Sequence, residues 1–183
     1  MFKRYTGSFA FRTSHVRRSA RAILILSLLS FPGYASASEG VFLRSLEGNW
    51  SGKARVRPRI NLPAVNLTCR FSMKASALAL SMEGTCKGLL VSGRTVEAKL
   101  RAAGSRYRGT YIGPAGGQSI LVGSRSGDAI ELTVRWSKEV NGDMTADMLI
   151  EKIGEAGLRL RTFDRDTATD KTVVTSDIEL ERE

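Results

Sequence analysis

The chain has 183 residues and a formal charge of +10, from 28 basic and 18 acidic side chains. Six of the basic residues and the sole histidine, His15, lie in the first 37 residues, which contain no acidic residue. The rest of the chain is therefore nearly balanced in charge and contains no histidine. We predict no nucleic-acid partner, and we exclude catalysis by imidazole and metal sites that need a histidine ligand.

The first 37 residues are predicted to be a signal peptide. A basic region precedes an apolar stretch at residues 22–31, and Pro32-Gly33 and the small residues Ala35 and Ala37 follow it. This is the three-part layout of a secretory signal, and its apolar part is too short to span a bilayer comfortably. We expect cleavage after Ala37, export to the periplasm of a Gram-negative-type cell envelope or secretion, and one domain at residues 38–183. An uncleaved membrane anchor is the alternative.

Residues 38–183 predict an all-β domain after one short helical turn at residues 41–46. Residues 130–136 show the pattern of a half-buried strand, with four apolar residues of one parity and three polar residues of the other. Ten such segments follow one another: 50–57, 65–73, 78–86, 96–102, 107–111, 118–123, 129–136, 145–153, 158–163 and 173–180. Residues 164–170 are expected to form a solvated hairpin loop rather than a calcium site.

Most of the predicted turns are short, so consecutive strands should pair as neighbours. A long meander hides its unpaired edges best by closing on itself. The sequence therefore predicts a single antiparallel up-and-down β-barrel of about 9–10 strands. The inward parity gives these candidate ligand-lining residues: Trp50, Phe71, Met82, Tyr107, Tyr111, Trp136 and Met148. The pattern leaves open whether the interior is hollow or filled by its large side chains.

The two cysteines, Cys69 and Cys86, have the parity of the apolar residues on two consecutive predicted strands. Both sulfurs should therefore face the interior from neighbouring strands. An even cysteine count in an exported chain favours one disulfide, and the absence of a Cys-x-x-Cys pair favours a structural bond over a redox-active one.

A short apolar helical turn followed by Gly48-x-Trp50 at the start of the first strand resembles the signature of the calycin superfamily, which includes the lipocalins. The resemblance implies an up-and-down barrel that binds small hydrophobic ligands, with the tryptophan plugging the closed end. It also implies a basic residue near the end of the chain that packs over the tryptophan, and Arg182 is the counterpart here. Haem-binding members use a histidine ligand, which residues 38–183 lack, so no cofactor is predicted.

The main functional hypothesis is an exported, non-enzymatic barrel that binds a small apolar ligand; no catalytic or metal-binding residue is predicted. The alternative is an envelope interaction module (an inhibitor, assembly factor or scaffold). It would meet an anionic envelope component through Arg55, Arg57 and Arg59 on the outer face. A small outer-membrane barrel is a further alternative. We do not expect an integral membrane protein, because only seven aromatic residues follow Gly40, too few for two interfacial girdles. The sequence predicts no particular oligomeric state.

Overall fold

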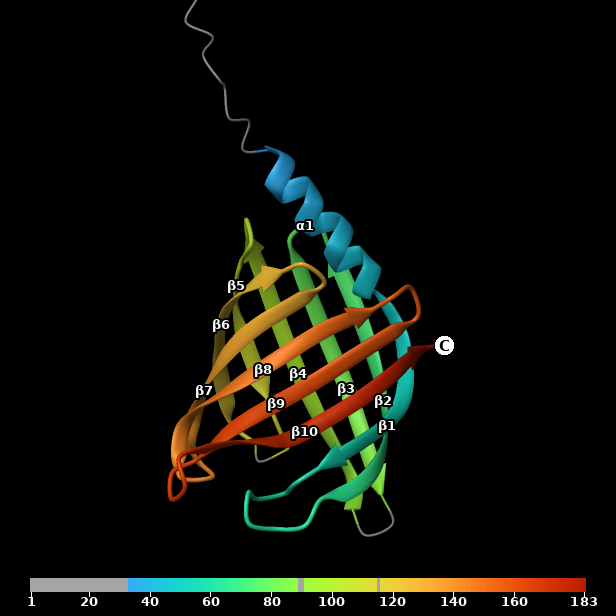
Figure 1. The fold of residues 1–183 in the computed structure, drawn as a ribbon. Helices are drawn as coiled ribbons and strands as arrows, with labels where there is room; N and C mark the ends of the chain where they lie inside the picture. Colours follow the sequence, from blue (N-terminus) through green and yellow to red (C-terminus); the bar gives the residue numbers. More distant parts are fainter. Residues whose placement is uncertain (1–32, 89–90, 115) are drawn as a thin grey trace, which may run out of the picture. The chain divides into compact units, whose positions relative to one another are not determined.

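The computed structural model describes residues 33–183 except residues 89, 90 and 115, so residues 1–32 of the predicted signal peptide lie outside the described residues. Helix α1 (Gly33–Leu46) leads into ten strands (Figure 1). The strands are β1 (Gly48–Val56), β2 (Val65–Ser76), β3 (Ala79–Gly88), β4 (Val91–Ala103), β5 (Arg106–Ile112), β6 (Gln118–Ser126), β7 (Ala129–Val140), β8 (Asp143–Ile153), β9 (Gly157–Asp166) and β10 (Lys171–Arg182).

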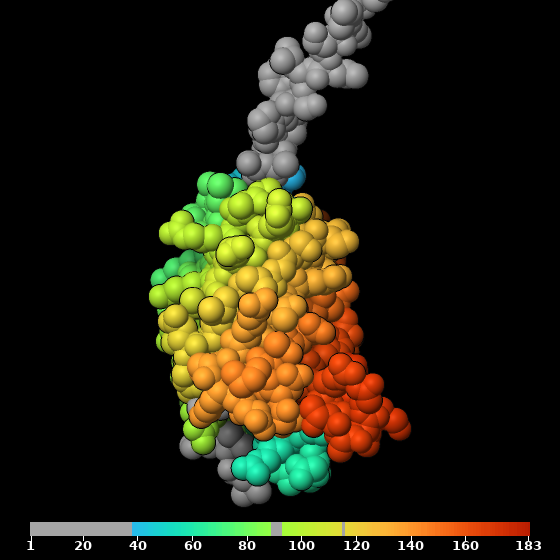
Figure 2. All heavy atoms as spheres, turned by 90° about the vertical axis from the view of Figure 1, so that its left-hand side faces the viewer, coloured from blue at the N-terminus to red at the C-terminus, as the bar shows by residue number. Residues whose placement is uncertain are grey.

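The strands form one closed antiparallel barrel. Each strand pairs with its neighbours in the chain, and β1 closes the ring by pairing with β10 from Trp50 opposite Arg182 to Val56 opposite Ser176. The predicted all-β up-and-down barrel is therefore confirmed, with ten strands. Figure 2 shows the side formed mainly by β5 to β8 as a continuous wall of side chains, with the loop at residues 57–64 below it.

Three boundaries differ from the expectation. Helix α1 begins at Gly33 rather than near residue 41, so it crosses the predicted cleavage point. Strand β4 begins at Val91, which narrows the expected break between β3 and β4. Strand β9 continues to Asp166, so Asp164 belongs to the strand and not to a solvated loop, and it is 3% exposed. The polarity of residues 164–170 hid the fact that Asp164 has the inward parity of Leu158 and Leu160.

Alternation along the strands builds the core. In β2, Cys69, Phe71 and Met73 are buried while their neighbours on either side are exposed. Cys69 lies directly opposite Cys86 of β3, and the two sulfurs are bonded at 2.05 Å. The predicted disulfide is confirmed, and it links the adjacent strands β2 and β3 on the inside of the barrel.

One end of the barrel is closed by α1 and Trp50. Leu43, Leu46 and Trp50 are fully buried, and the Trp50 indole Nε1 donates a hydrogen bond to the Leu46 carbonyl at 3.0 Å. The Arg182 guanidinium lies over the Trp50 ring, 4.2 Å from its centroid, and donates to the Ser45 carbonyl at 2.6 Å and to the Glu47 carbonyl. The end of β10 thus caps the carbonyls at the end of the helix.

Glycine is required at position 48, where the Arg182 side chain passes close to the start of β1. Its φ is +135°, a conformation that side chains disfavour, and a Cβ there would come within 2.5 Å of Arg182 Nη1. The Gly48-x-Trp50 pattern therefore has a local physical cause: the glycine makes room for the arginine that covers the tryptophan.

A buried polar cluster fixes the middle of α1 to the barrel. The Glu39 carboxylate, 2% exposed, accepts a hydrogen bond from the Tyr107 hydroxyl at 2.5 Å and one from Arg125 Nε at 2.9 Å. The Arg125 guanidinium also lies 4.7 Å from the Phe42 ring centroid. Burial, followed by the hydrogen bond to Glu39, raises the pKa of Tyr107 well above its ordinary value. The strand pattern did not indicate a role for Glu39, although it is the first acidic residue of the chain.

Candidate functional site

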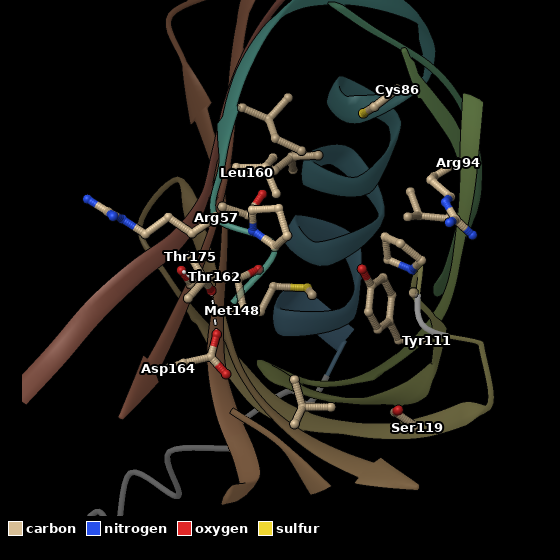
Figure 3. Close-up of a pocket in the computed structure, with 18 of the residues that line it drawn as sticks. Arg57, Cys86, Arg94, Tyr111, Ser119, Met148, Leu160, Thr162, Asp164 and Thr175 are labelled. Atoms are coloured by element: carbon tan, nitrogen blue, oxygen red, sulfur yellow. Dashed lines mark hydrogen bonds between the residues drawn. The ribbon is translucent and has the colours of Figure 1, made fainter. Parts of the chain in front are cut away.

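The interior is hollow at the end opposite α1. A cavity of about 500 Å³ lies among the last residues of β1, β5, β7 and β9 and the first residues of β2, β4 and β6. Because α1 precedes the first residue of β1, the cavity and the helix occupy opposite ends of the barrel. Figure 3 shows the cavity residues in front and α1 behind them.

The walls of the cavity are mostly apolar. Ten of the apolar side chains that line it come from seven of the strands: Val56, Val65, Leu67, Phe71, Met82, Val96, Met148, Ile150, Leu160 and Ile178. Cys86 of the disulfide also lines it. The Phe71 ring lies over Gly84, where an added Cβ would come within 2.1 Å of the ring. This glycine lets the ring lie against the β3 wall, which leaves space in front of it.

Five of the seven predicted ligand-lining residues line this cavity: Phe71, Met82, Tyr111, Trp136 and Met148. The other two, Trp50 and Tyr107, lie at the closed end in the contacts with α1 and Arg182 described above. Parity alone placed all seven inside the barrel. It did not indicate which end of each strand a residue occupies, and the cavity depends on that position.

The three arginines predicted to form an anionic-surface patch lie in different surroundings. Arg55 is exposed on β1, opposite Asp177 of β10. Arg57 follows β1, donates to the Leu62 carbonyl at 3.2 Å, and points away from the cavity (Figure 3). Arg59 is exposed in the loop at residues 57–64. Nearby, Asp177 is already held by two hydrogen bonds from Arg159, at 2.8 and 2.7 Å, which lower the pKa of its carboxyl.

Tyr111 and Trp136 form an aromatic pair in the cavity wall. Their ring centroids are 6.1 Å apart with the planes tilted by 55°. Burial raises the pKa of Tyr111 to about 12, so its hydroxyl is neutral at physiological pH. The Trp136 Nε1 is buried and has no hydrogen-bond partner among the described residues. Each side chain is a hydrogen-bond donor set in an apolar wall.

Asp164 is the one acidic residue among the described residues that line the cavity. A β-bulge in β10 between Val174 and Ser176 turns Thr175 inward, where its hydroxyl donates to Asp164 Oδ2 (Figure 3). Asp164 Oδ1 is buried and has no partner among the described residues. A buried carboxylate without a cation is costly to maintain. Asp164 is therefore a buried acidic group with one oxygen that lacks a hydrogen-bond partner among the described residues. Its inward parity on β9 was the sequence signal that could have identified it.

Residues 167–170 form a hairpin turn within the segment that was expected to be a loop. Asp166 accepts hydrogen bonds from the Ala168 amide at 3.0 Å and the Thr169 hydroxyl at 2.7 Å, and Asp170 pairs with Arg165. Within the described part of the chain, no group of three or more histidine, cysteine or acidic side chains is placed to hold a metal ion. Among the same residues, no helix is both long and apolar enough to cross a membrane.

These features define a closed ten-stranded up-and-down barrel with one packed end and one end open to an apolar cavity. No protein-family model matches the chain, and no curated protein matches it. Among solved structures, the crystal structure of Rv2717c from M. tuberculosis is similar, with a TM-score of 0.60 and 17% sequence identity. The match covers 77% of this chain and 94% of that one. At this identity the similarity concerns the fold alone.

Proposed function

We propose that the protein is a non-enzymatic, exported binding barrel that holds a small apolar ligand in the open half of its interior. The cavity carries this proposal. Its volume of about 500 Å³ falls within the 300–1,000 Å³ typical of small-molecule sites, and its lining is mainly apolar with a few polar groups. The Cys69–Cys86 disulfide fits an oxidising compartment such as the periplasm.

The free-energy cost of an empty cavity indicates that water or a ligand fills it. Protein interiors are normally packed to the density of organic crystals. At about 24 cal/mol per Å³, an empty cavity of 500 Å³ would destabilise the fold by about 12 kcal/mol. That is comparable to the whole stability of a typical domain, about 5–15 kcal/mol. Water must therefore fill the cavity when no ligand does, and an apolar ligand that displaces this water gains the hydrophobic free energy.

The test is the binding of an environment-sensitive apolar dye to the processed protein, together with native mass spectrometry of protein purified from its own envelope. Met148→Trp enlarges a cavity-lining side chain and should abolish dye binding. Ile120→Trp makes the matched change at a 54% exposed outer position and should leave binding unchanged. Equal dye binding by both variants, or no dye binding and no co-purified mass in the wild type, would refute a carrier role.

A further inference from the structure

The mouth of the cavity carries charges of opposite sign on opposite walls. Arg94 lies on β4 and Asp164 on β9, and these strands are five apart in either direction around the ring of ten. Both residues line the cavity, and Figure 3 shows them on opposite sides of it. Each has the inward parity of its strand: Arg94 shares the parity of Val96 and Ala98, and Asp164 that of Leu160. Both positions lie within three residues of a strand end, whereas the apolar lining continues deeper into the barrel.

On the β9 side of the cavity, the Asp164 carboxylate accepts hydrogen bonds. One carboxylate oxygen is taken by Thr175 and the other has no partner, and none of the salt bridges among the described residues involves Asp164. Rotation about the terminal χ2 of an aspartate is soft, so the carboxylate can turn an oxygen toward a molecule in the cavity. A cation or N–H donor arriving there would supply the missing partner.

The opposite wall donates hydrogen bonds. Arg94 is exposed and takes part in none of the salt bridges among the described residues. Tyr111 lies on the neighbouring strand β5, on the same side of the cavity (Figure 3). No hydrogen bond of its hydroxyl occurs within the described part of the chain, and its raised pKa keeps the proton on the oxygen. Arginine and a neutral phenol together suit a carboxylate, phosphate or carbonyl oxygen.

The other basic side chains of the lining, Arg57, Lys138 and Arg161, have interactions of their own. Arg57 points away from the cavity and donates to the Leu62 carbonyl, and Arg161 pairs with Glu151 at 3.2 Å. The mouth is therefore dipolar rather than uniformly basic. A simple fatty acid would satisfy Arg94 but leave Asp164 without a donor, and a simple alkylamine would satisfy Asp164 but leave Arg94 without an anion.

We propose that the ligand is a single-chain amphiphile with a zwitterionic head. Its anionic group lies against Arg94 and Tyr111, its ammonium group lies against Asp164, and its apolar chain extends toward Phe71 and Met148. This inference rests on the proposed function, because it names the class of molecule that the same cavity holds.

The test compares three probes with alkyl chains of eleven or twelve carbons at pH 7, below their micelle concentrations: N-dodecylglycine (zwitterionic), dodecanoate (anionic) and dodecylamine (cationic). Affinity is measured by displacement of the apolar dye. N-dodecylglycine is expected to bind at least about tenfold more tightly than either of the others, since each of them lacks one charge-assisted contact. Similar affinities for all three probes would overturn the inference while leaving the proposed function intact. Binding of neither probe nor dye would instead refute the proposed function.

Two variants assign the preference to the two walls. Arg94→Gln should weaken N-dodecylglycine binding about tenfold and shift the preference between the singly charged probes toward dodecylamine; Asp164→Asn should shift it toward dodecanoate. Arg101→Gln and Asp147→Asn are matched controls on the outer faces of β4 and β8 and should change neither preference. Shifts of equal size in the controls would overturn the inference. Because Arg94 is exposed, its variant keeps the test decisive even if Asp164→Asn fails to fold.

Discussion

The packing of Trp50 at the closed end allows a quantitative prediction: Trp50→Phe should lower the free energy of unfolding by about 2–4 kcal/mol. The substitution removes the hydrogen bond from Nε1 to the buried Leu46 carbonyl, and a carbonyl left unpaired costs about 1–3 kcal/mol. The smaller ring also gives a weaker contact with the Arg182 guanidinium, worth about 0.5–1 kcal/mol. Loss of packing volume in a fully buried site adds to both effects.

The assay is urea unfolding of the processed protein followed by circular dichroism, with the melting temperature as a second readout. For a domain of this size each kcal/mol corresponds to about 2–4 °C, so the melting temperature should fall by roughly 5–15 °C. Trp136→Phe is the matched control. Its indole nitrogen has no hydrogen-bond partner among the described residues, so the same substitution should cost about 1 kcal/mol or less.

Introducing Arg182→Ala into the wild type and into Trp50→Phe then isolates the contact between the Trp50 and Arg182 side chains. The double-mutant cycle should show a coupling energy of about 0.5 kcal/mol or more. Strict additivity, or an equal loss for Trp50→Phe and Trp136→Phe, would show that the closed end is not held by these contacts.

Three further predictions concern the disulfide, the tyrosines and the start of the domain. Replacing both Cys69 and Cys86 by alanine should lower the free energy of unfolding by about 3 kcal/mol, because the bond closes a segment with a sequence separation of 17; an unchanged urea midpoint would contradict this. Tyr107 and Tyr111 should both remain neutral at pH 10 in a near-ultraviolet titration. Since the unfolded chain releases these protons near the ordinary pKa of 10.0 and the folded chain retains them, stability should fall as the pH rises from 10 toward 12; rising stability would contradict the burial of both rings. Intact mass measurement of the exported protein should give a first residue of Ser38, and a mass that retains residues 1–37 would favour the membrane anchor instead.

The strand pattern predicted the barrel because the alternation of apolar and polar residues along a half-buried strand identifies the face that points inward. Trp136 lies between the polar residues Arg135 and Ser137, and the disulfide followed from the shared parity of Cys69 and Cys86. Position along the barrel axis was not predictable in the same way. Tyr107 and Tyr111 have the same parity on β5, yet the first meets Glu39 at the closed end and the second faces the cavity.

The amino-acid sequence by itself therefore determined the class of fold, the pairing of the cysteines and the set of side chains that face inward, because each depends on short-range periodicity. Only the tertiary structure decided where the interior is packed and where it is hollow, since that depends on which strand ends meet α1. It also decided that Asp164 meets Thr175: the bulge in the neighbouring strand turns Thr175 inward, and no local pattern in residues 164–170 encodes that contact.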